Sequence, residues 1–308
     1  MRNGLDWKAA NACERFTACF AVLLGIFIAL QARTVASVAA LVGDGLFAVL
    51  LVRGLPRLRH VRNPVARYFG VTLPLAGFYG MYLQTGLLDP ALVHWHDATL
   101  AELQGYLLPQ VPYLPWSPVR QWFVFAYLCY EPILIAGTVA LFLPGTMASQ
   151  RRAGDAVRRL CYALAACFVI GLLYPAMSPR YVTPELHLRY LGSGLFSRLA
   201  ILAGRSAMVP GTSFPSAHVA AVVTLMWDLW AAGGGAARRT LFWLFLPLVA
   251  SMTAGTVLFL FHYVPDVIAA VVVAVAAVVV DDWRIARQAA HGGPGAKTMK
   301  ATAELPLQ

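Results

Sequence analysis

Residues 262–280 read HYVPDVIAAVVVAVAAVVV, a short polar stretch that leads directly into an apolar run. As a helix, Val264–Val280 is long enough to cross most of the hydrocarbon core of a bilayer. A second stretch of the same design, FPSAH at residues 214–218, opens a largely apolar run that continues to Trp230. Both segments predict membrane helices that begin with a polar group containing a histidine.

The composition of the whole chain extends this prediction. Of the 308 residues, 59% are hydrophobic and 12% are charged, and the mean hydropathy is +0.66, which is too apolar for a soluble domain. We therefore predict an all-α fold, a polytopic membrane bundle of about eight transmembrane helices. The predicted spans are Phe16–Gln31, Thr34–Val52, Tyr68–Leu83, Gln121–Leu143, Leu160–Ala176, Pro215–Trp230, Leu241–Phe261 and Val264–Val280.

Basic residues cluster after every second apolar segment. Under the positive-inside rule these clusters mark the cytoplasmic side and place both termini there. The net charge of +10 is thereby explained as a set of orientation signals, and it implies no nucleic-acid partner. The clusters are Arg53, Arg57, Arg59, Arg62 and Arg67; Arg151, Arg152, Arg158 and Arg159; Arg238 and Arg239; and Arg284, Arg287, Lys297 and Lys300.

Three connections then fall on the outer side, namely Gln84–Arg120, Met177–Phe214 and the turn at His262. The second of them carries four arginines against the orientation rule: Arg180, Arg189, Arg198 and Arg205. Because a guanidinium suits phosphate geometry, we predict that Arg180 binds phosphate. For at least two of the four, snorkelling or contact with lipid head groups is the alternative.

The first outer connection contains a predicted interfacial helix. Ala98–Leu108 alternates apolar and polar residues, which is typical of an amphipathic helix lying on the outer leaflet. We interpret the preceding residues His94–Asp97 as interfacial rather than as a metal site. The five cysteines have no ligand-like spacing, so we predict no metal and no cofactor.

We expect three parts in the chain. Residues 1–159 would form N-terminal transmembrane helices with the outer amphipathic segment, residues 160–287 a catalytic bundle, and residues 288–308 a disordered cytoplasmic tail. Three carboxylates fall inside predicted spans, where they are costly. We expect Asp44, Glu131 and Asp228 to be neutral or paired with a neighbouring helix, with no link to the site.

The chemistry of the last polar stretch depends on His262 and Asp266. Four residues apart, they are predicted to share one face of a helix that is entering the membrane. The carboxylate would accept the Nδ1 proton of the imidazole and leave Nε2 with a lone pair, which makes His262 a candidate nucleophile. The alternative is a hydrogen-bonded pair that only closes a helix end.

The FPSAH stretch supplies the complementary groups. The Ser216 hydroxyl and neighbouring backbone N–H groups, that of Ala217 among them, are predicted to hold an anion at the positive end of a helix dipole. His218 would protonate a leaving oxygen at the same place. Serine after proline is also an ordinary helix start, and capping is the alternative for Ser216. Together the two histidines favour phosphoryl transfer through a phosphohistidine, without a metal.

These residues resemble a known family. FPSAH is similar to the Pro-Ser-x-His motif, and His262–Asp266 to the His-x-x-x-Asp motif, of the phosphatidic acid phosphatase type 2 superfamily, which also includes vanadium haloperoxidases. The resemblance covers roughly residues 160–282. It implies that His262 is the nucleophile and that His218 is the general acid, in agreement with the roles argued from the residues.

Two of the family's features are missing. No lysine with an arginine-proline seven residues later precedes Phe214, and Gly255-Thr256 replaces the usual serine-arginine pair. Tyr174–Tyr181 instead resembles a stretch of the subgroup that includes fungal inositol phosphorylceramide synthase, and so does Leu100–Pro109. This resemblance implies that Arg180 supplies the phosphate clamp.

The resemblance favours a membrane lipid phosphotransferase that acts at the outer leaflet and passes a phospho-head-group from a phospholipid to a lipid or polyol alcohol. One alternative is a phosphatase acting on phosphatidate, a prenyl pyrophosphate or a similar lipid phosphate. Another is a non-catalytic lipid-binding or transport protein. The expected partners are a phospholipid or lipid phosphate and the bilayer, and the oligomeric state is left open.

Overall fold

The computed structural model describes residues 10–88, 94–143, 145–207, 209, 211–231 and 236–290, and within these ranges it is all-helical, as predicted. The only β-type pairing described is at Ala176, which forms isolated bridges with Gly211 and Thr212. The helices are α1 Ala12–Ala32, α2 Val35–Val49, the π-helix η1 Leu50–Gly54, α3 Leu55–Leu58, α4 Pro64–Gln84, the 3-10 helix η2 Thr85–Leu87, α5 Asp97–Leu107, α6 Ser117–Leu128, α7 Tyr130–Phe142, α8 Met147–Leu173, α9 Pro179–Val182, α10 Pro184–Leu191, α11 Leu195–Ala207, α12 Ala217–Ala231, α13 Ala236–Leu258 and α14 Val264–Ala290.

Local sequence explains where several of these helices begin. Asn11 caps α1 in a capping box with Glu14, and Thr34 caps α2 in the same way with Ser37. The side chain of Asn63 accepts the first free N–H groups of α4, whose first residue is Pro64. These caps mark the points where α1, α2 and α4 begin.

The described residues contain five helical segments long and apolar enough to cross a membrane, or six if the bent pair α6–α7 counts as one span. That pair corresponds to the predicted span Gln121–Leu143, but it bends by 52° at Cys129. The segments that match α4 and α12 are not among the candidates. With 15 residues, α12 is only about 22 Å long, shorter than the hydrocarbon core. The predicted total of eight is therefore not confirmed.

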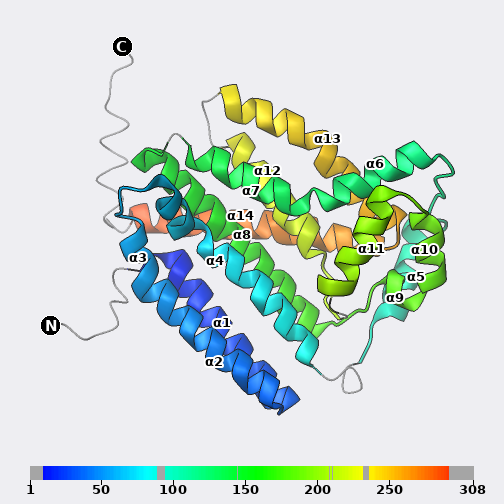
Figure 1. Ribbon diagram of the computed structural model, residues 1–308, viewed down its shortest axis with the longest axis horizontal. Coiled ribbons are helices and arrows are strands. Elements are labelled where there is room, and N and C mark those ends of the chain that lie inside the picture. The colour runs from blue at the N-terminus through cyan, green and yellow to red at the C-terminus, as the bar shows by residue number, and fades with distance from the viewer. Residues whose placement is uncertain are drawn as a thin grey trace.

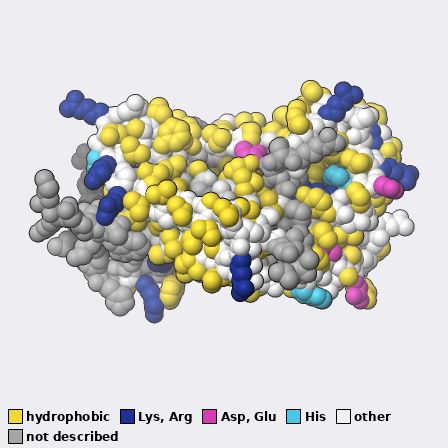
Figure 2. Space-filling view, turned by 60° about the horizontal axis from the view of Figure 1, so that its bottom comes forward, with side chains coloured by type: hydrophobic (Ala, Val, Ile, Leu, Met, Phe, Trp, Pro, Cys, Tyr) yellow, Lys and Arg dark blue, Asp and Glu magenta, His cyan; other side chains and the backbone are white. Residues whose placement is uncertain are grey.

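The outside of the molecule is apolar in the way expected of a membrane protein. On α2 the outward residues include Val35, Val42 and Leu46, and on α14 they include Val272 and Val279. Figure 2 shows one face on which apolar side chains cover the middle, whereas most Lys and Arg side chains lie toward the two ends. This pattern is expected of a chain that crosses a bilayer, because charged residues lie at the two membrane surfaces and apolar residues lie between them.

The long helix α8 lies at the centre of the bundle. It packs against α1, α4, α7, α12 and α14, while α13 packs against α6 and α12 (Figure 1). The helices α5, α9, α10 and α11 gather at one end of the bundle, and α3 and the C-terminal part of α14 lie at the other. The first turns of α12 and α14 therefore point toward the end that carries the short helices.

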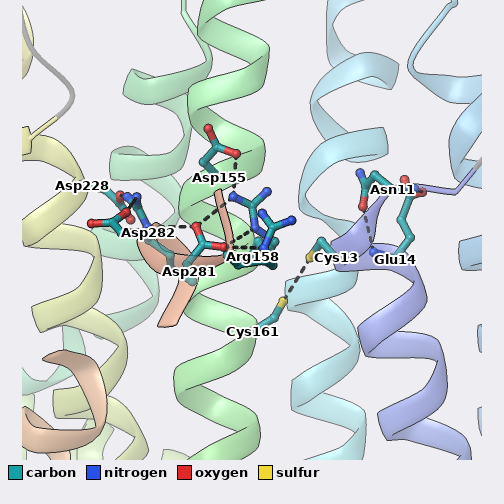
Figure 3. Close-up of polar contacts among 11 residues, drawn as sticks. Asn11, Cys13, Glu14, Asp155, Arg158, Cys161, Asp228, Asp281 and Asp282 are labelled. Atoms are coloured by element: carbon teal, nitrogen blue, oxygen red, sulfur yellow. Dashed lines mark hydrogen bonds and ion pairs between the residues drawn. The ribbon is translucent and has the colours of Figure 1, made fainter. Parts of the chain in front are cut away.

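At the other end, a network of ion pairs joins α8 to α12 and α14 (Figure 3). The guanidinium of Arg158 makes two bonds to the carboxylate of Asp281, with Nε to Oδ1 at 2.7 Å and Nη2 to Oδ2 at 2.8 Å. Arg159 pairs with Asp228 of α12 and with Asp282 of α14. We refer to these five residues as the charge network.

The other intramembrane carboxylates have ordinary surroundings. Asp44 accepts a hydrogen bond from the side chain of Gln84 at 2.8 Å, and Glu131 is exposed on α7. Of the predicted tail, residues 288–290 continue α14 as helix, and residues 291–308 lie outside the described part of the chain. The predicted amphipathic helix at Ala98–Leu108 corresponds to α5, which buries Asp97 and Leu100 and exposes Leu103, Tyr106 and Leu107.

Candidate active site

The two polar stretches meet at the end of the bundle that carries the short helices. The backbone N–H of Ser216 donates to the carbonyl of Asp266 at 3.1 Å, so the two motifs are joined directly. The ring centroids of His218 and His262 are 6.3 Å apart. Residues separated widely in the sequence thus form one cluster, built on the first turns of α12 and α14.

His262 lies in the turn before α14, and the prediction that it shares a helix face with Asp266 is wrong. The turn contains Leu260 with a φ of 59°, which is incompatible with a continuing right-handed helix. Pro265 fits the first turn of α14, because a proline there lacks only an N–H that would have no partner. The helix accordingly begins at Val264, and the Asp266 carboxylate reaches back to the turn.

Three donor groups lie within hydrogen-bonding distance of one carboxylate oxygen of Asp266. Its Oδ2 lies 3.1 Å from His262 Nδ1, accepts the backbone N–H of Tyr263 at 3.0 Å and accepts the Ser213 hydroxyl at 2.7 Å. The Ser213 Oγ is also 3.3 Å from His262 Nδ1. Because Nδ1 faces a carboxylate, it carries the proton of the neutral ring, and Nε2 holds the lone pair.

Ser216 is fully buried and works as the N-cap of α12. Its hydroxyl accepts the N–H of Val219 at 3.5 Å, and its own backbone N–H donates to the carbonyl oxygen of Asp266. The geometry therefore matches the capping alternative for this serine. Helix geometry leaves the N–H groups of Ala217 and His218 without an intrahelical acceptor, and these are the groups of the α12 N-terminus that remain available to an anion.

Aromatic side chains surround His218. Its ring centroid is 4.4 Å from that of Tyr130 and 5.7 Å from that of Tyr127. Tyr127 also stacks on Phe261, the neighbour of His262, with centroids 4.2 Å apart and an interplanar angle of 2°. The rings that flank the histidines come from α6, α7 and the turn before α14.

Arg180 lies beside both histidine-bearing elements. Its guanidinium carbon is 4.7 Å from the ring centroid of Tyr181 and 6.0 Å from that of Phe261, and its side chain hydrogen-bonds Tyr127. Arg189 instead lies near the ring of Tyr113, at 5.9 Å.

The other two outer arginines add no described contact to the cluster. Arg198 is exposed on α11, and the side chain of Arg205 lies outside the described residues. Of the three arginines in this connection whose side chains the structure describes, Arg180 is the one that lies at the cluster.

Sequence reasoning missed His187, a third buried histidine at the cluster. Its Nδ1 lies 2.5 Å from the carbonyl oxygen of Phe259, and its ring is 5.0 Å from that of Phe261. Burial lowers the pKa of His187, and the nearby charge of Arg180 lowers it further, against the opposing effect of the bond to Phe259. The His187 ring is therefore neutral and donates its Nδ1–H to the carbonyl of Phe259. No motif in the sequence points to it.

Sequence reasoning also missed Asp97. The interpretation of that segment was based on its neighbours His94 and His96. Its carboxylate accepts the backbone N–H groups of Met177 and Ser178 at 2.8 Å and 3.0 Å, and the hydroxyl of Tyr263 at 3.2 Å. Together with Ser213, it belongs to the set of buried polar residues that hold the cluster. Across the described ranges, no group of three or more His, Cys, Asp or Glu side chains is arranged to hold a metal ion.

The region of the chain that forms this site matches a known protein family. The model of the PAP2 superfamily matches residues 114–280, which is more than half of the chain. The chain belongs to the PAP2 superfamily. The match begins at Leu114 and so includes α6 and α7, whose tyrosines flank His218. No curated protein and no solved structure matches the chain in the corresponding comparisons.

Membership of the PAP2 superfamily is compatible with lipid phosphatase or lipid phosphotransferase activity. Both activities need a nucleophile, a proton donor and groups that bind phosphate. The cluster holds candidates for all three, in His262, His218 and Arg180 with the N-terminus of α12.

Proposed function

We propose that this protein is a membrane lipid phosphotransferase that works through a phosphohistidine on His262. The observation that carries the proposal is the pairing of His262 Nδ1 with the Asp266 carboxylate at 3.1 Å, with the His218 ring 6.3 Å from that of His262. Arg180 at the same cluster offers the positive charge that a phosphate requires. Membership of the PAP2 superfamily supports the same chemistry.

In the first step, His262 Nε2 attacks the phosphorus of a phospholipid. A bond forms between Nε2 and phosphorus, and the bond from phosphorus to the lipid alcohol oxygen breaks. His218 gives its proton to that oxygen, and the lipid alcohol leaves. The negative phosphate favours the protonated form of His218 before attack, while Asp266 stabilises the positive charge that develops on His262.

In the second step, an acceptor alcohol resolves the intermediate. Its oxygen attacks phosphorus, the bond between Nε2 and phosphorus breaks, and His218 takes the proton of the acceptor hydroxyl. Both histidines return to their starting states. Arg180 and the free N–H groups of Ala217 and His218 would bind the phosphate oxygens through both steps.

Transfer to an alcohol, rather than to water, requires a site shielded from bulk water. The observation that favours transfer is the attachment of α5 to the site. Besides the bonds of Asp97, the side chain of Gln104 accepts the backbone N–H of Val264 at 3.2 Å, so α5 is held against the first turn of α14. An α5 fixed beside the cluster is suited to shield a phosphoenzyme. The phosphatase and the non-catalytic alternatives remain the other outcomes of the test.

Purified protein in proteoliposomes provides that test. With a phospholipid donor alone, we expect little release of phospho-head-group into water. Addition of a lipid alcohol such as diacylglycerol or ceramide should then yield a new phospholipid at a rate that matches donor consumption. Rapid phosphate release from a lipid monoester, unchanged by the alcohol, would make the protein a phosphatase. If no donor leaves phosphate on a histidine, the non-catalytic alternative holds.

The site is proposed to face the outer side of the membrane, because the basic clusters lie at the opposite ends of the spans. In a variant without native cysteines, single cysteines replace Leu188 of α10, which is 51% exposed, and Met147 of α8, which is 81% exposed. A membrane-impermeant maleimide added to intact cells should label position 188 and should label position 147 only after permeabilisation. Labelling of position 147 in intact cells would reverse the orientation.

A further inference from the structure

Asp97 is the first residue of α5, and only 7% of it is exposed. Acidic residues are common in the first turn of a helix, where they interact with the helix dipole and the free N–H groups. The bonds described for this carboxylate go elsewhere, however. Its three donors lie 80, 81 and 166 residues away in the sequence. Asp97 therefore acts between distant segments rather than as an ordinary helix cap.

Two of the three donors belong to the segment that leads into α9. Oδ2 accepts the N–H of Met177, and Oδ1 accepts the N–H of Ser178, two residues before Arg180. Ser178 has a φ of 97°, a conformation that non-glycine residues rarely adopt. Its hydroxyl donates to the carbonyl of Phe261 at 2.6 Å. The bonds to Asp97 thus help to hold a strained backbone that positions Arg180.

The third donor is the hydroxyl of Tyr263, next to the proposed nucleophile. Tyr263 is buried, and its backbone N–H donates to Asp266. Burial and the charge of Asp97 raise the pKa of the Tyr263 hydroxyl, so it keeps its proton and donates it to the carboxylate. Asp97 is consequently bonded both to the Arg180 segment and to the His262 turn.

We propose that Asp97 is a positioning residue of the phosphoryl-transfer site, which holds the Arg180 segment and the His262 turn in one fixed arrangement. The proposal rests on the proposed function, since it assigns Arg180 and His262 to a single reaction. A buried carboxylate is costly to keep, and here it is retained where two segments that carry site residues meet. Small displacements of such groups lower the rate of a chemical step strongly.

The central variant is Asp97→Asn, which keeps the shape of the side chain but turns one acceptor into a donor that faces N–H groups. We expect kcat to fall on the order of 10–100-fold, with a smaller change in KM for the lipid donor. Glu102→Gln is the matched control, because Glu102 is an exposed carboxylate on the same helix, and it should leave kcat unchanged. Thermal unfolding of each variant is measured in parallel. A wild-type kcat in Asp97→Asn would overturn the proposal.

A double-mutant cycle separates positioning from a general loss of stability. If Asp97 acts through Arg180, the effect of Asp97→Asn should be much smaller in an Arg180→Lys background than in the wild type. Independent, fully multiplicative effects would contradict the proposal. Tyr263→Phe removes a single hydroxyl and serves if Asp97→Asn does not fold. It should lower kcat several-fold, and an unchanged kcat would contradict the proposed arrangement.

A readout without turnover keeps the two proposals distinguishable. Diethyl pyrocarbonate modifies accessible histidines, and mass spectrometry follows each site. Loosening of the His262 turn in Asp97→Asn, or in Tyr263→Phe, should raise the modification rate of His262, which is buried, and leave that of the exposed His60 unchanged. Equal His262 rates in variant and wild type would refute the positioning role. Failure of the wild type to react with any lipid donor would refute the proposed function alone.

Discussion

Replacement of His262 by alanine is expected to abolish turnover, with a loss on the order of 10⁴-fold or more, because the proposed mechanism forms its covalent intermediate on this side chain. The variant should also lose the acid-labile phosphate that the wild type carries after reaction with a donor. Rapid quenching with a labelled phospholipid donor measures both quantities. Because the His262 side chain is buried and bonded to Asp266, thermal unfolding is measured to show that the variant is folded.

His218→Ala should give a different pattern, because a proton donor matters most when the leaving oxygen is basic. We expect intermediate formation to slow on the order of 10²–10⁴-fold with poor leaving groups and less with good ones. The matched control is His60→Ala, an exposed histidine outside the site, which should keep wild-type activity. Full activity of His262→Ala would refute the phosphohistidine, and equal losses for all leaving groups would remove His218 from the role of acid.

The second large effect concerns stability. Asp281→Ala should lower the free energy of unfolding by about 3–5 kcal/mol, since it leaves the buried guanidinium of Arg158 without its bidentate partner. Asp281 has no exposed side-chain surface and also contacts Arg159 and Arg284. Denaturant unfolding in detergent micelles, followed by tryptophan fluorescence, provides the measurement.

Asp282→Ala is the control for the charge network. Asp282 is adjacent in sequence and pairs with Arg159, but its side chain is 52% exposed. Exposed ion pairs contribute roughly 0–1 kcal/mol, so this variant should be close to the wild type. If the two variants are equally stable, the network does not hold α8 to α14. Replacement of Arg158 and Asp281 together by Met and Leu should recover most of the loss.

The helices of the fold were largely accessible to prediction, since long apolar runs and their caps are local signals. Ala98–Leu108 was predicted as a helix, and α5 covers almost the same residues. Two errors concern the points where helices break. The bend at Cys129 inside the predicted span Gln121–Leu143 was not predicted, although Pro132, three residues later, lacks the N–H that a continuous helix would bond to the carbonyl of Leu128. Spacing alone placed His262 on a helix, because it does not record the left-handed turn at Leu260.

The residues of the candidate site also differ in whether the sequence alone reveals them. The two histidine stretches and Arg180 could be recognised in the sequence, because polar residues in apolar surroundings are identified by residue type alone. Ser213, His187 and Asp97 did not, because their importance comes from partners 53, 72 and up to 166 residues away. Serine before a proline-containing motif, or a histidine in a short outer helix, has no distinctive pattern. Only the folded arrangement shows which of them contact the cluster.

The charge network also constrains the two helices on which the candidate site is built. α12 and α14 are joined at their first turns by the bond from Ser216 to Asp266, and at the far ends both are tied to α8 through Arg159. Two attachments, one near each end, resist both rotation and sliding of one helix past the other. We therefore expect the spacing of the two histidines to be set by the bundle, and under the proposed function a substrate tail would enter between helices outside this frame.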